Sequence, residues 1–316
     1  MAVSARVIKR RIKSTKSTGK IMKAMELVAA SKMRRATQLA LGTRPYAHHI
    51  REMANDLRRR IDPRDYALLV GLGIRHQALG IRTMLVILSS DRGLCGGFNN
   101  QLIKKAIEFV KTRGEDAISV VTVGRRAEAA VRRANLKIVA SFESISNAPS
   151  FARVEPSAKF ISEEFLNGRV DRVFIAYTDF KSALSQVPAV QQWLPITPEA
   201  ELTPEMAPAD SVEEDSDDLP TTDERLPFDE PEGELFEPTS AKVLSALLPK
   251  MVEMQLYQSF LESAASEHSA RMMAMRSAGD AASEMLENLT FTLNQARQAA
   301  ITREISEISA GAAAIK

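Results

Sequence analysis

The chain has 316 residues, of which 45% are hydrophobic and only 5% aromatic, and it contains 13 methionines. This composition can supply a buried core, and it favours helices packed through flexible and small side chains over an aromatic-rich β-sandwich. Cys95 is the only cysteine, which excludes an internal disulfide and favours a reducing compartment. The net charge of +2 hides a strong polarity: residues 1–60 carry 16 Lys and Arg against 3 acids, and residues 199–237 carry 16 acids against Arg225 alone.

Neither a membrane span nor a secretory leader is expected. No apolar run approaches the ~18–20 residues that a membrane-spanning helix needs, and the opening string MAVSARVIKRRIKST lacks the apolar core of a signal peptide. This string is rich in Arg and Ser and poor in acids, which is also typical of a mitochondrial transit peptide. The transit-peptide alternative stays open at this point.

Residues 4–60 are predicted to form one helix, because no proline interrupts them before Pro45. Apolar or small side chains recur at steps of three and four residues and form a narrow stripe, which is typical of a coiled-coil seam. The other faces of this helix are basic. The seam positions are Ile8, Ile12, Thr15, Gly19, Met22, Met25, Ala29, Met33, Ala36 and Ala40.

Short apolar, β-branched strings then alternate with helical patterns, which predicts an α/β domain of βαβ units with a mostly parallel sheet. Pro188 cannot donate to a strand ladder, so the string that contains it is predicted as a last strand at the edge of the sheet. The predicted strands are 82–90, 117–124, 136–142, 171–180 and 187–196, and the predicted helices are 98–113, 124–134 and 153–167.

The string SSDRGLCGGFNNQ (89–101) lies between a predicted strand and a predicted helix, where glycine-rich turns can expose backbone N–H groups to phosphate. It lacks the Lys-Ser/Thr ending of a phosphate-binding loop, and its glycines do not fit G-x-G-x-x-G. A tight turn fixed by an Asp–Arg pair is therefore favoured over a nucleotide site. Cys95 is interpreted as a small buried residue, because no histidine is placed to act as its base. The turn residues are Asp91, Arg92, Gly93, Cys95, Gly96 and Gly97.

Residues 197–233 are acidic and rich in proline, with almost no periodicity. They offer too little apolar surface to order themselves, so they are predicted to be a solvated, largely disordered insert.

A helical pattern returns at Thr239 and continues to the end of the chain, with a predicted kink or early break at Pro249. Beyond Pro249, heptad spacing is kept as far as Ala300. Without a break, residues 240–314 would extend for roughly 110 Å at ~1.5 Å per residue, which is more than a central domain can cover. Much of this helix must find a partner elsewhere, and an antiparallel pair with the first helix would leave its C-terminal end projecting furthest.

No pair of carboxylates and no His/Cys cluster has the spacing of a catalytic or metal site, so neither a cofactor nor a metal is expected. The basic first helix could bind nucleic acid, but Tyr46 and Tyr66 are the only aromatic residues before position 90 and offer no stacking surface. A nucleic-acid-binding coiled coil and a nucleotide-dependent enzyme that uses residues 90–99 are the two alternatives.

Five strings together closely resemble one family, the gamma subunits of rotary proton-translocating ATP synthases. They are RIKSTKSTGKIMKAMELVAASKMRRA (11–36), RPYA (44–47), SDRGLCGGFN (90–99), SEHSARMMAMRSA (266–278) and NQARQAAITREISEISAGAAA (294–314). They cover both ends of the chain and the first strand of its middle domain, in the family's order and spacing.

The resemblance implies an α/β fold in which a long antiparallel coiled coil of the terminal helices carries a Rossmann-like domain. It implies a non-catalytic central-stalk rotor whose partners are the alpha and beta subunits of a catalytic hexamer, the epsilon subunit and the membrane c ring. Nucleic acid is not an expected partner, and the membrane is reached only through the complex. The implied location is the cytoplasmic face of a bacterial cell membrane, with a mitochondrial or plastid inner membrane as the alternative.

The resemblance also implies contact residues. Coupling contacts to the beta subunits are expected at Met25, Arg34, Arg35, Arg297, Gln298 and Thr302. A foot against the c ring and epsilon is expected at Arg44, Pro45, Tyr46, Glu234, Leu235, Phe236 and Glu237. The predicted division of the chain is a coiled-coil helix (1–60), the Rossmann-like domain (61–196), the acidic insert (197–233) and a second coiled-coil helix (234–316).

The sequence departs from the family pattern at two places. Gly279 and Ala281 stand where the family favours Thr and Asn, and a glycine inside a helix costs ~1 kcal/mol relative to alanine. The acidic insert is longer than in most bacterial relatives and contains no cysteine, so a thiol switch of the chloroplast kind is not expected.

Overall fold

The computed structural model describes residues 5–59, 66–70, 81–114, 118–196 and 239–314. They form two compact units. The helical unit takes residues 1–31, 94–96 and 268–316 of the chain, and the sheet unit takes 32–93 and 97–267. The described elements are α1 (Ala5–Arg59), α2 (Ala67–Val70), β1 (Thr83–Leu88), α3 (Phe98–Arg113), β2 (Ile118–Val123), α4 (Arg125–Arg133), β3 (Ile138–Phe142), α5 (Phe151–Leu166), β4 (Arg172–Phe180), β5 (Gln186–Leu194) and α6 (Ser240–Ala314).

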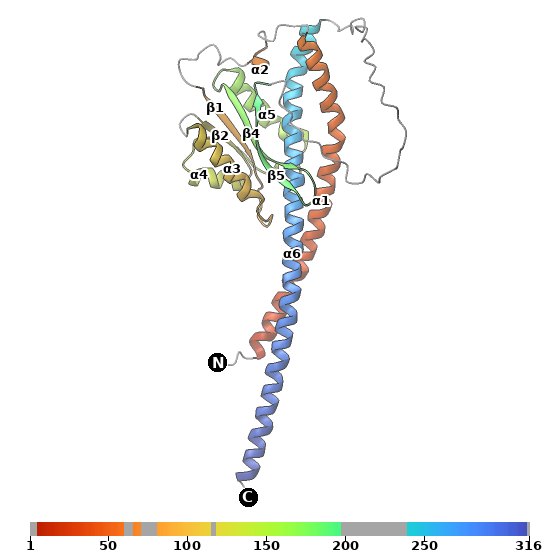
Figure 1. The fold of residues 1–316 in the computed structure, drawn as a ribbon, viewed down its shortest axis with the longest axis vertical. Coiled ribbons are helices and arrows are strands. Elements are labelled where there is room, and N and C mark those ends of the chain that lie inside the picture. Colours follow the sequence, from red (N-terminus) through yellow and green to blue (C-terminus); the bar gives the residue numbers. More distant parts are fainter. Residues whose placement is uncertain (1–4, 60–65, 71–80, 115–117, 197–238, 315–316) are drawn as a thin grey trace, which may run out of the picture. The chain divides into compact units, whose positions relative to one another are not determined.

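The sheet unit contains one five-stranded sheet in the order β3-β2-β1-β4-β5 (Figure 1). Strands β1 to β4 are parallel, and β5 is antiparallel to β4 at the edge. Pro188 lies in this edge strand opposite Thr178, where a missing N–H leaves the rest of the sheet intact. The predicted α/β fold with a mostly parallel sheet is confirmed, and the strands and helices predicted in residues 82–196 begin and end within two residues of the observed ones.

Both faces of the sheet are covered, which explains why β1 is buried at all six positions. Met84, Val86 and Leu88 belong to a large core together with side chains of α5 and α6. The alternate residues Leu85 and Ile87 belong to a second core with α3 and α4, and these two helices lie together on one face in Figure 1. The sheet is therefore the middle of three layers.

Within the sheet unit, α1 packs against α6 through small side chains and one polar group. Ala36, Ala264 and Ala265 are buried together against Phe180. The Thr43 hydroxyl donates to Gln258 Oε1 at 2.7 Å. Gln258 Nε2 donates to the carboxylate of Glu262 at 3.0 Å.

In the helical unit the same two helices run antiparallel. Thr15 contacts Met285 with Oγ1 and Sδ 3.8 Å apart, and a Cβ on Gly19 would lie 3.7 Å from the Cβ of Ala282. Along α1 the predicted seam residues are buried or half-buried between exposed neighbours, so the predicted coiled-coil stripe is confirmed. Counting back in this pairing places Ala5 about opposite Gln295, near the N-terminal end of the described part of α1.

The predicted break at Pro249 is wrong, because α6 continues through it without interruption. A proline removes one helical hydrogen bond and crowds the preceding turn. Leu248, Met251 and Val252 on either side are at most 5% exposed in the large core, so tertiary packing outweighs the local cost. The helix also continues through Gly279, where an added Cβ would meet nothing within 4 Å.

Candidate functional site

The carboxyl edge of the parallel strands is where an open α/β sheet usually binds ligands, at the point where the strand order reverses. In this sheet that point lies between β1 and β4. Helix α6 covers it: Ser263 Oγ donates to the carbonyl of Leu88 at 3.2 Å, and Ser266 Oγ donates to the carbonyl of Thr178 at 3.1 Å. Both serines are buried, so the position that a nucleotide would occupy is filled by the chain itself.

The turn after β1 is held by its own polar side chains. The backbone N–H of Ser90 donates to Asn99 Oδ1 at 3.1 Å, and Asn99 Nδ2 donates to Ser90 Oγ at 2.8 Å. Ser90 Oγ in turn donates to the carbonyl of Arg92 at 2.6 Å. Ser90 and Asn99 are buried, so the two ends of the turn are tied together beneath its exposed tip.

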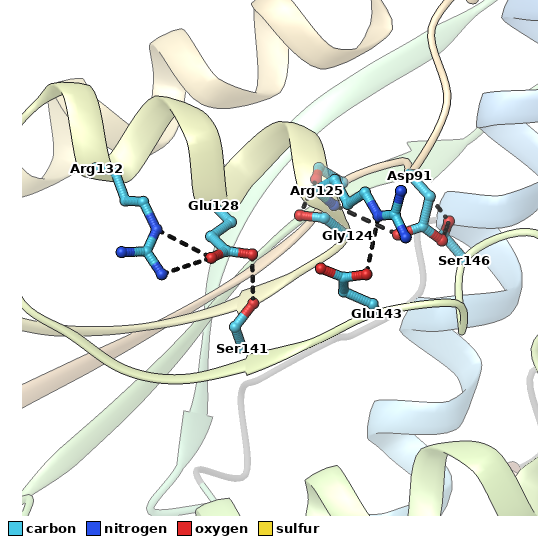
Figure 2. A network of polar contacts seen from close by, with 9 residues as sticks. Asp91, Gly124, Arg125, Glu128, Arg132, Ser141, Glu143 and Ser146 are labelled. Atoms are coloured by element: carbon cyan, nitrogen blue, oxygen red, sulfur yellow. Dashed lines mark hydrogen bonds and ion pairs between the residues drawn. The ribbon is translucent and has the colours of Figure 1, made fainter.

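Asp91 joins this turn to the neighbouring loop and to α4 (Figure 2). Its carboxylate accepts a hydrogen bond from Ser146 Oγ at 3.1 Å and one from the backbone N–H of Arg125 at 3.4 Å. The sequence suggested Arg92 as the partner that fixes the turn, and it gave no sign of Ser146, which lies 55 residues away. Cys95 is 2% exposed, and its expected lack of chemistry stays a prediction.

Two ion pairs extend the network along α4 (Figure 2). Arg125 Nε lies 2.8 Å from Glu143 Oε2, and this hydrogen bond raises the pKa of Arg125. Arg132 lies 2.7 Å from Glu128 Oε1, and Ser141 Oγ donates to Glu128 Oε2 at 3.0 Å. The Arg132 hydrogen bond, followed by that of Ser141, lowers the pKa of Glu128. These contacts fasten α4 to β3 and the loop after it, and among the described residues no three His, Cys, Asp or Glu side chains are grouped to hold a metal.

The C-terminal part of α6 has a different surface from the rest of the helix. Every residue from 297 to 310 is exposed. Ile301, Ile305 and Ile308 are 49%, 59% and 67% exposed, and their spacing of four and three places them on one side of the helix. An exposed apolar stripe on a slim helix indicates a contact with another chain.

Comparisons with known proteins identify the chain's family. The model of the family described as ATP synthase matches residues 4–315. The ATP synthase gamma chain of Herpetosiphon aurantiacus is 39% identical over 99% of each chain, and that of Heliobacterium modesticaldum is 39% identical over 98% of each. The chain belongs to the ATP synthase gamma-chain family. The resemblance found in the sequence is thereby confirmed.

Solved structures of more distant relatives support the fold. A chain of the mitochondrial ATP synthase of Euglena gracilis matches with a TM-score of 0.62 at 19% identity, over 98% of this chain and 94% of that one. A chain from the central stalk and c ring of the Tetrahymena thermophila mitochondrial ATP synthase matches with a TM-score of 0.54 at 22% identity, over 82% and 99%. This chain shares their fold, in which long terminal helices accompany an α/β domain.

The gamma-chain contact residues expected from the sequence occupy separate places. Met25 is half-buried at the seam of the helical unit, and Arg34 and Arg35 are exposed on the part of α1 in the sheet unit. Arg297, Gln298 and Thr302 are exposed on α6.

The structure describes part of the predicted foot. Pro45 and Tyr46 are exposed on α1, and Arg44 is described only as part of that helix. Residues 234–237 lie outside the described residues, and so does the acidic insert. Sequence reasoning missed the serines at 263 and 266, because serines on a helix carry no signal that they meet the backbone carbonyls of a sheet.

The filled crevice leads to a prediction about nucleotides. The isolated gamma chain is expected to bind ATP neither stoichiometrically nor with micromolar affinity, because α6 occupies the crevice and the turn after β1 has no phosphate-loop lysine. Isothermal titration calorimetry of ATP into the pure chain measures this directly. A one-to-one isotherm in the micromolar range would contradict it.

Proposed function

We propose that the chain is the non-catalytic central-stalk rotor of an ATP synthase. In this role it couples proton flow through a membrane c ring to ATP synthesis and hydrolysis at catalytic sites on alpha and beta subunits. The observation that carries the proposal is the end of α6, where residues 297–310 are exposed and continue past the described start of α1. A long helix that the described residues of its own chain leave exposed requires a surrounding surface that other subunits provide.

The chemistry of this end suits a shaft that turns. Small side chains keep the helix slim, and good helix formers keep it stiff. A large apolar side chain would hold the helix in one orientation, since its burial would stabilise that orientation by ~1.5–3 kcal/mol. Apart from Ile301, Ile305 and Ile308, the exposed residues from 299 to 310 are small, polar or charged, so few large apolar side chains are present to hold the helix at one angle.

The partners follow from the same role. We infer contacts with the alpha and beta subunits through Met25, Arg34, Arg35, Arg297, Gln298 and Thr302. The residues expected in the foot, Arg44 to Tyr46 and 234–237, would meet the c ring and the epsilon subunit. The four-part division at residues 60, 196 and 233 belongs to this proposal, with residues 61–196 as the domain between the two helices in sequence.

The site of action we propose is the cytoplasmic face of a bacterial cell membrane. Support comes from the 39% identity to chains of bacteria such as Herpetosiphon aurantiacus, against 19% and 22% for the mitochondrial chains. None of the helices described in residues 5–59, 66–70, 81–114, 118–196 and 239–314 is long and apolar enough to cross a membrane.

A reversible crosslink tests rotation. The affinity-tagged chain is expected to co-purify with alpha, beta and epsilon subunits. Ser309→Cys, on the exposed end of α6, is then linked through a reducible reagent to the surrounding subunits. A rotor held in this way should lose at least tenfold in ATP hydrolysis and recover when the link is reduced.

The control is the same reagent on a complex with Ser309 unchanged. Full hydrolysis in the linked complex would argue for a static subunit, and purification of the chain alone would argue against the assembly.

A further inference from the structure

Two buried serines of α6 join this helix to the backbone of the sheet. Ser263 Oγ donates to the carbonyl of Leu88 at 3.2 Å, and Ser266 Oγ donates to that of Thr178 at 3.1 Å. Leu88 ends β1 and Thr178 lies near the end of β4, so the two bonds reach two different strands. All four residues are at most 7% exposed and belong to the sheet unit.

The serine bonds lie where β1 and β4 part. The pairing of these two strands ends at Ile87 and Ala176, one residue before Leu88 and two before Thr178. Strands that part leave backbone carbonyls without a ladder partner on that side, and a buried carbonyl requires a hydrogen bond. The serines supply it, so α6 is fastened to the sheet by its backbone as well as by side-chain packing.

The same stretch of α6 is the last part of the helix in the sheet unit. The large core reaches along α6 only as far as Leu261, and the next buried apolar side chains are the small ones of Ala264 and Ala265. The sheet unit's share of the helix ends at Glu267. A force carried along α6 from the exposed end therefore enters the sheet unit where the serines bind it.

Apolar packing and hydrogen bonds respond differently when α6 turns about its axis. Apolar burial is non-directional and depends on area, so it changes little over a small rotation. A hydrogen bond weakens steeply as its angle departs from linear. A turn of about 20° moves the Cα atoms, ~2.3 Å from the helix axis, by ~0.8 Å, and it moves the hydroxyls further. Such a shift misaligns both serine bonds, so they resist the turn before apolar area is lost.

We propose that Ser263 and Ser266 are the residues through which α6 passes torque to the sheet unit. The inference rests on the proposed rotor function, in which a force at the exposed end of α6 must reach the domain that carries β1 and β4. The two serines are positioning residues, which hold the angle of α6 relative to the strand ends. Because each bonds a different strand, the loss of both should loosen the joint more than the loss of either.

Single-molecule rotation measures the stiffness of this joint in the assembled complex. A hexamer of alpha and beta subunits that holds the chain is fixed to a surface, and a bead is attached through Lys104→Cys, an exposed position on α3 in the sheet unit, in a Cys95→Ser background. Rotation of the bead in ATP is recorded first. After ATP is washed out, the variance of the bead angle reports the torsional stiffness. Ser263→Ala with Ser266→Ala should raise this variance at least twofold, and each single variant should give an intermediate value.

Two control variants separate the joint from a general effect of mutation. Ser259 is buried on the same side of α6, one turn before Ser263, but its hydroxyl donates to the carbonyl of Gln255 within the helix at 3.1 Å. Gly114→Ala strains a residue with φ +92° and so destabilises the sheet unit, while nothing lies within 4 Å of the added Cβ. Ser259→Ala and Gly114→Ala should both leave the variance within about 1.3-fold of the wild type.

The outcomes for this joint and for the rotor function are distinguishable. A bead that rotates in ATP, with a variance raised only by the loss of Ser263 and Ser266, supports the inference. A bead that rotates while the double variant keeps the wild-type variance, or while the control variants raise it equally, would overturn the inference and leave the rotor function standing. A bead that does not rotate on the wild-type chain would overturn both.

Discussion

Replacing Gly124 with alanine is expected to lower the free energy of unfolding of the sheet unit by about 2–6 kcal/mol. Gly124 has φ +88° between β2 and α4, where an L side chain is strained by about 1–3 kcal/mol. A Cβ at this position would also lie 2.4 Å from the carbonyl oxygen of Ser89 and 2.9 Å from its carbonyl carbon. Such distances require the backbone of one strand end to move.

The backbone at Ser89 has little freedom to move. Its N–H donates to the carbonyl of Val123 at 2.9 Å, and its hydroxyl donates to the same carbonyl at 3.0 Å. The hydroxyl also accepts from the N–H of Ala127 in the first turn of α4, at 2.8 Å. Ser89 is 2% exposed, so a shift that breaks one of these bonds leaves a buried polar group unpaired, at a cost of about 1–3 kcal/mol.

A second glycine separates the strain from the collision. Gly114 has φ +92° and ψ 127°, close to the φ +88° and ψ 143° of Gly124, but nothing lies within 4 Å of a Cβ placed there. Gly114→Ala should therefore cost only the conformational strain. Trp193, the single tryptophan, is 1% exposed in the core of the sheet unit and reports urea unfolding by fluorescence. Equal urea midpoints for Gly124→Ala and Gly114→Ala would contradict the prediction, because they would show that the backbone at Ser89 moves away from the new Cβ at no cost.

The features that the sequence could reveal are those with a local period. Short apolar strings that alternate with helical patterns predicted the strands. A strand that is buried on both faces, as β1 is, requires an unbroken apolar run. The steps of three and four residues along α1 identified the seam, whose members Ile8, Ala29 and Ala40 are at most 3% exposed. In each case neighbouring residues carry the information, because the period of a helix or a strand is set by its own backbone.

The features that the sequence could not reveal join residues that are far apart along the chain. Ser263 and Leu88 are 175 residues apart, and neither residue type by itself indicates that α6 fills the crevice. Pro249 shows the opposite problem: its local rule predicts a break, but residues on both sides of it pack into the large core and hold the helix together. The hydrogen bond between Asp91 and Ser146 is hidden for the same reason as the contact between Ser263 and Leu88, since a hydroxyl partner has no sequence signature.

The substitutions with the largest expected effect on function are at the exposed end of α6. A complex that carries Arg297→Ala with Gln298→Ala is expected to hydrolyse and synthesise ATP at least tenfold more slowly, while it purifies with full subunit stoichiometry. Both side chains are exposed within the chain, so their loss removes no contact of the folded subunit. This expectation rests on the proposed contact between these residues and the beta subunits.

The size of the effect follows from the kind of bond that an arginine can make. A hydrogen bond from Arg297 to a carboxylate on a neighbouring subunit is worth about 1.5–3 kcal/mol, and 1.4 kcal/mol corresponds to a factor of ten. A partner loop would hold such a bond at one rotor angle and lose it at the next. The bond would then bias the angle and hence the rate in both directions, with little effect on whether the subunits assemble.

A neighbouring arginine provides the matched control. At about 100° per residue, Arg303 lies on the opposite side of α6 from Gln298, Ile301 and Ile305, and it is also exposed. Arg303→Ala removes the same charge from the same stretch of helix without touching the side that we expect to meet the beta subunits. Its turnover should stay within about twofold of the wild type. A double variant at 297 and 298 that turns over at the wild-type rate, or that fails to assemble, would show that these side chains do not couple rotation to catalysis.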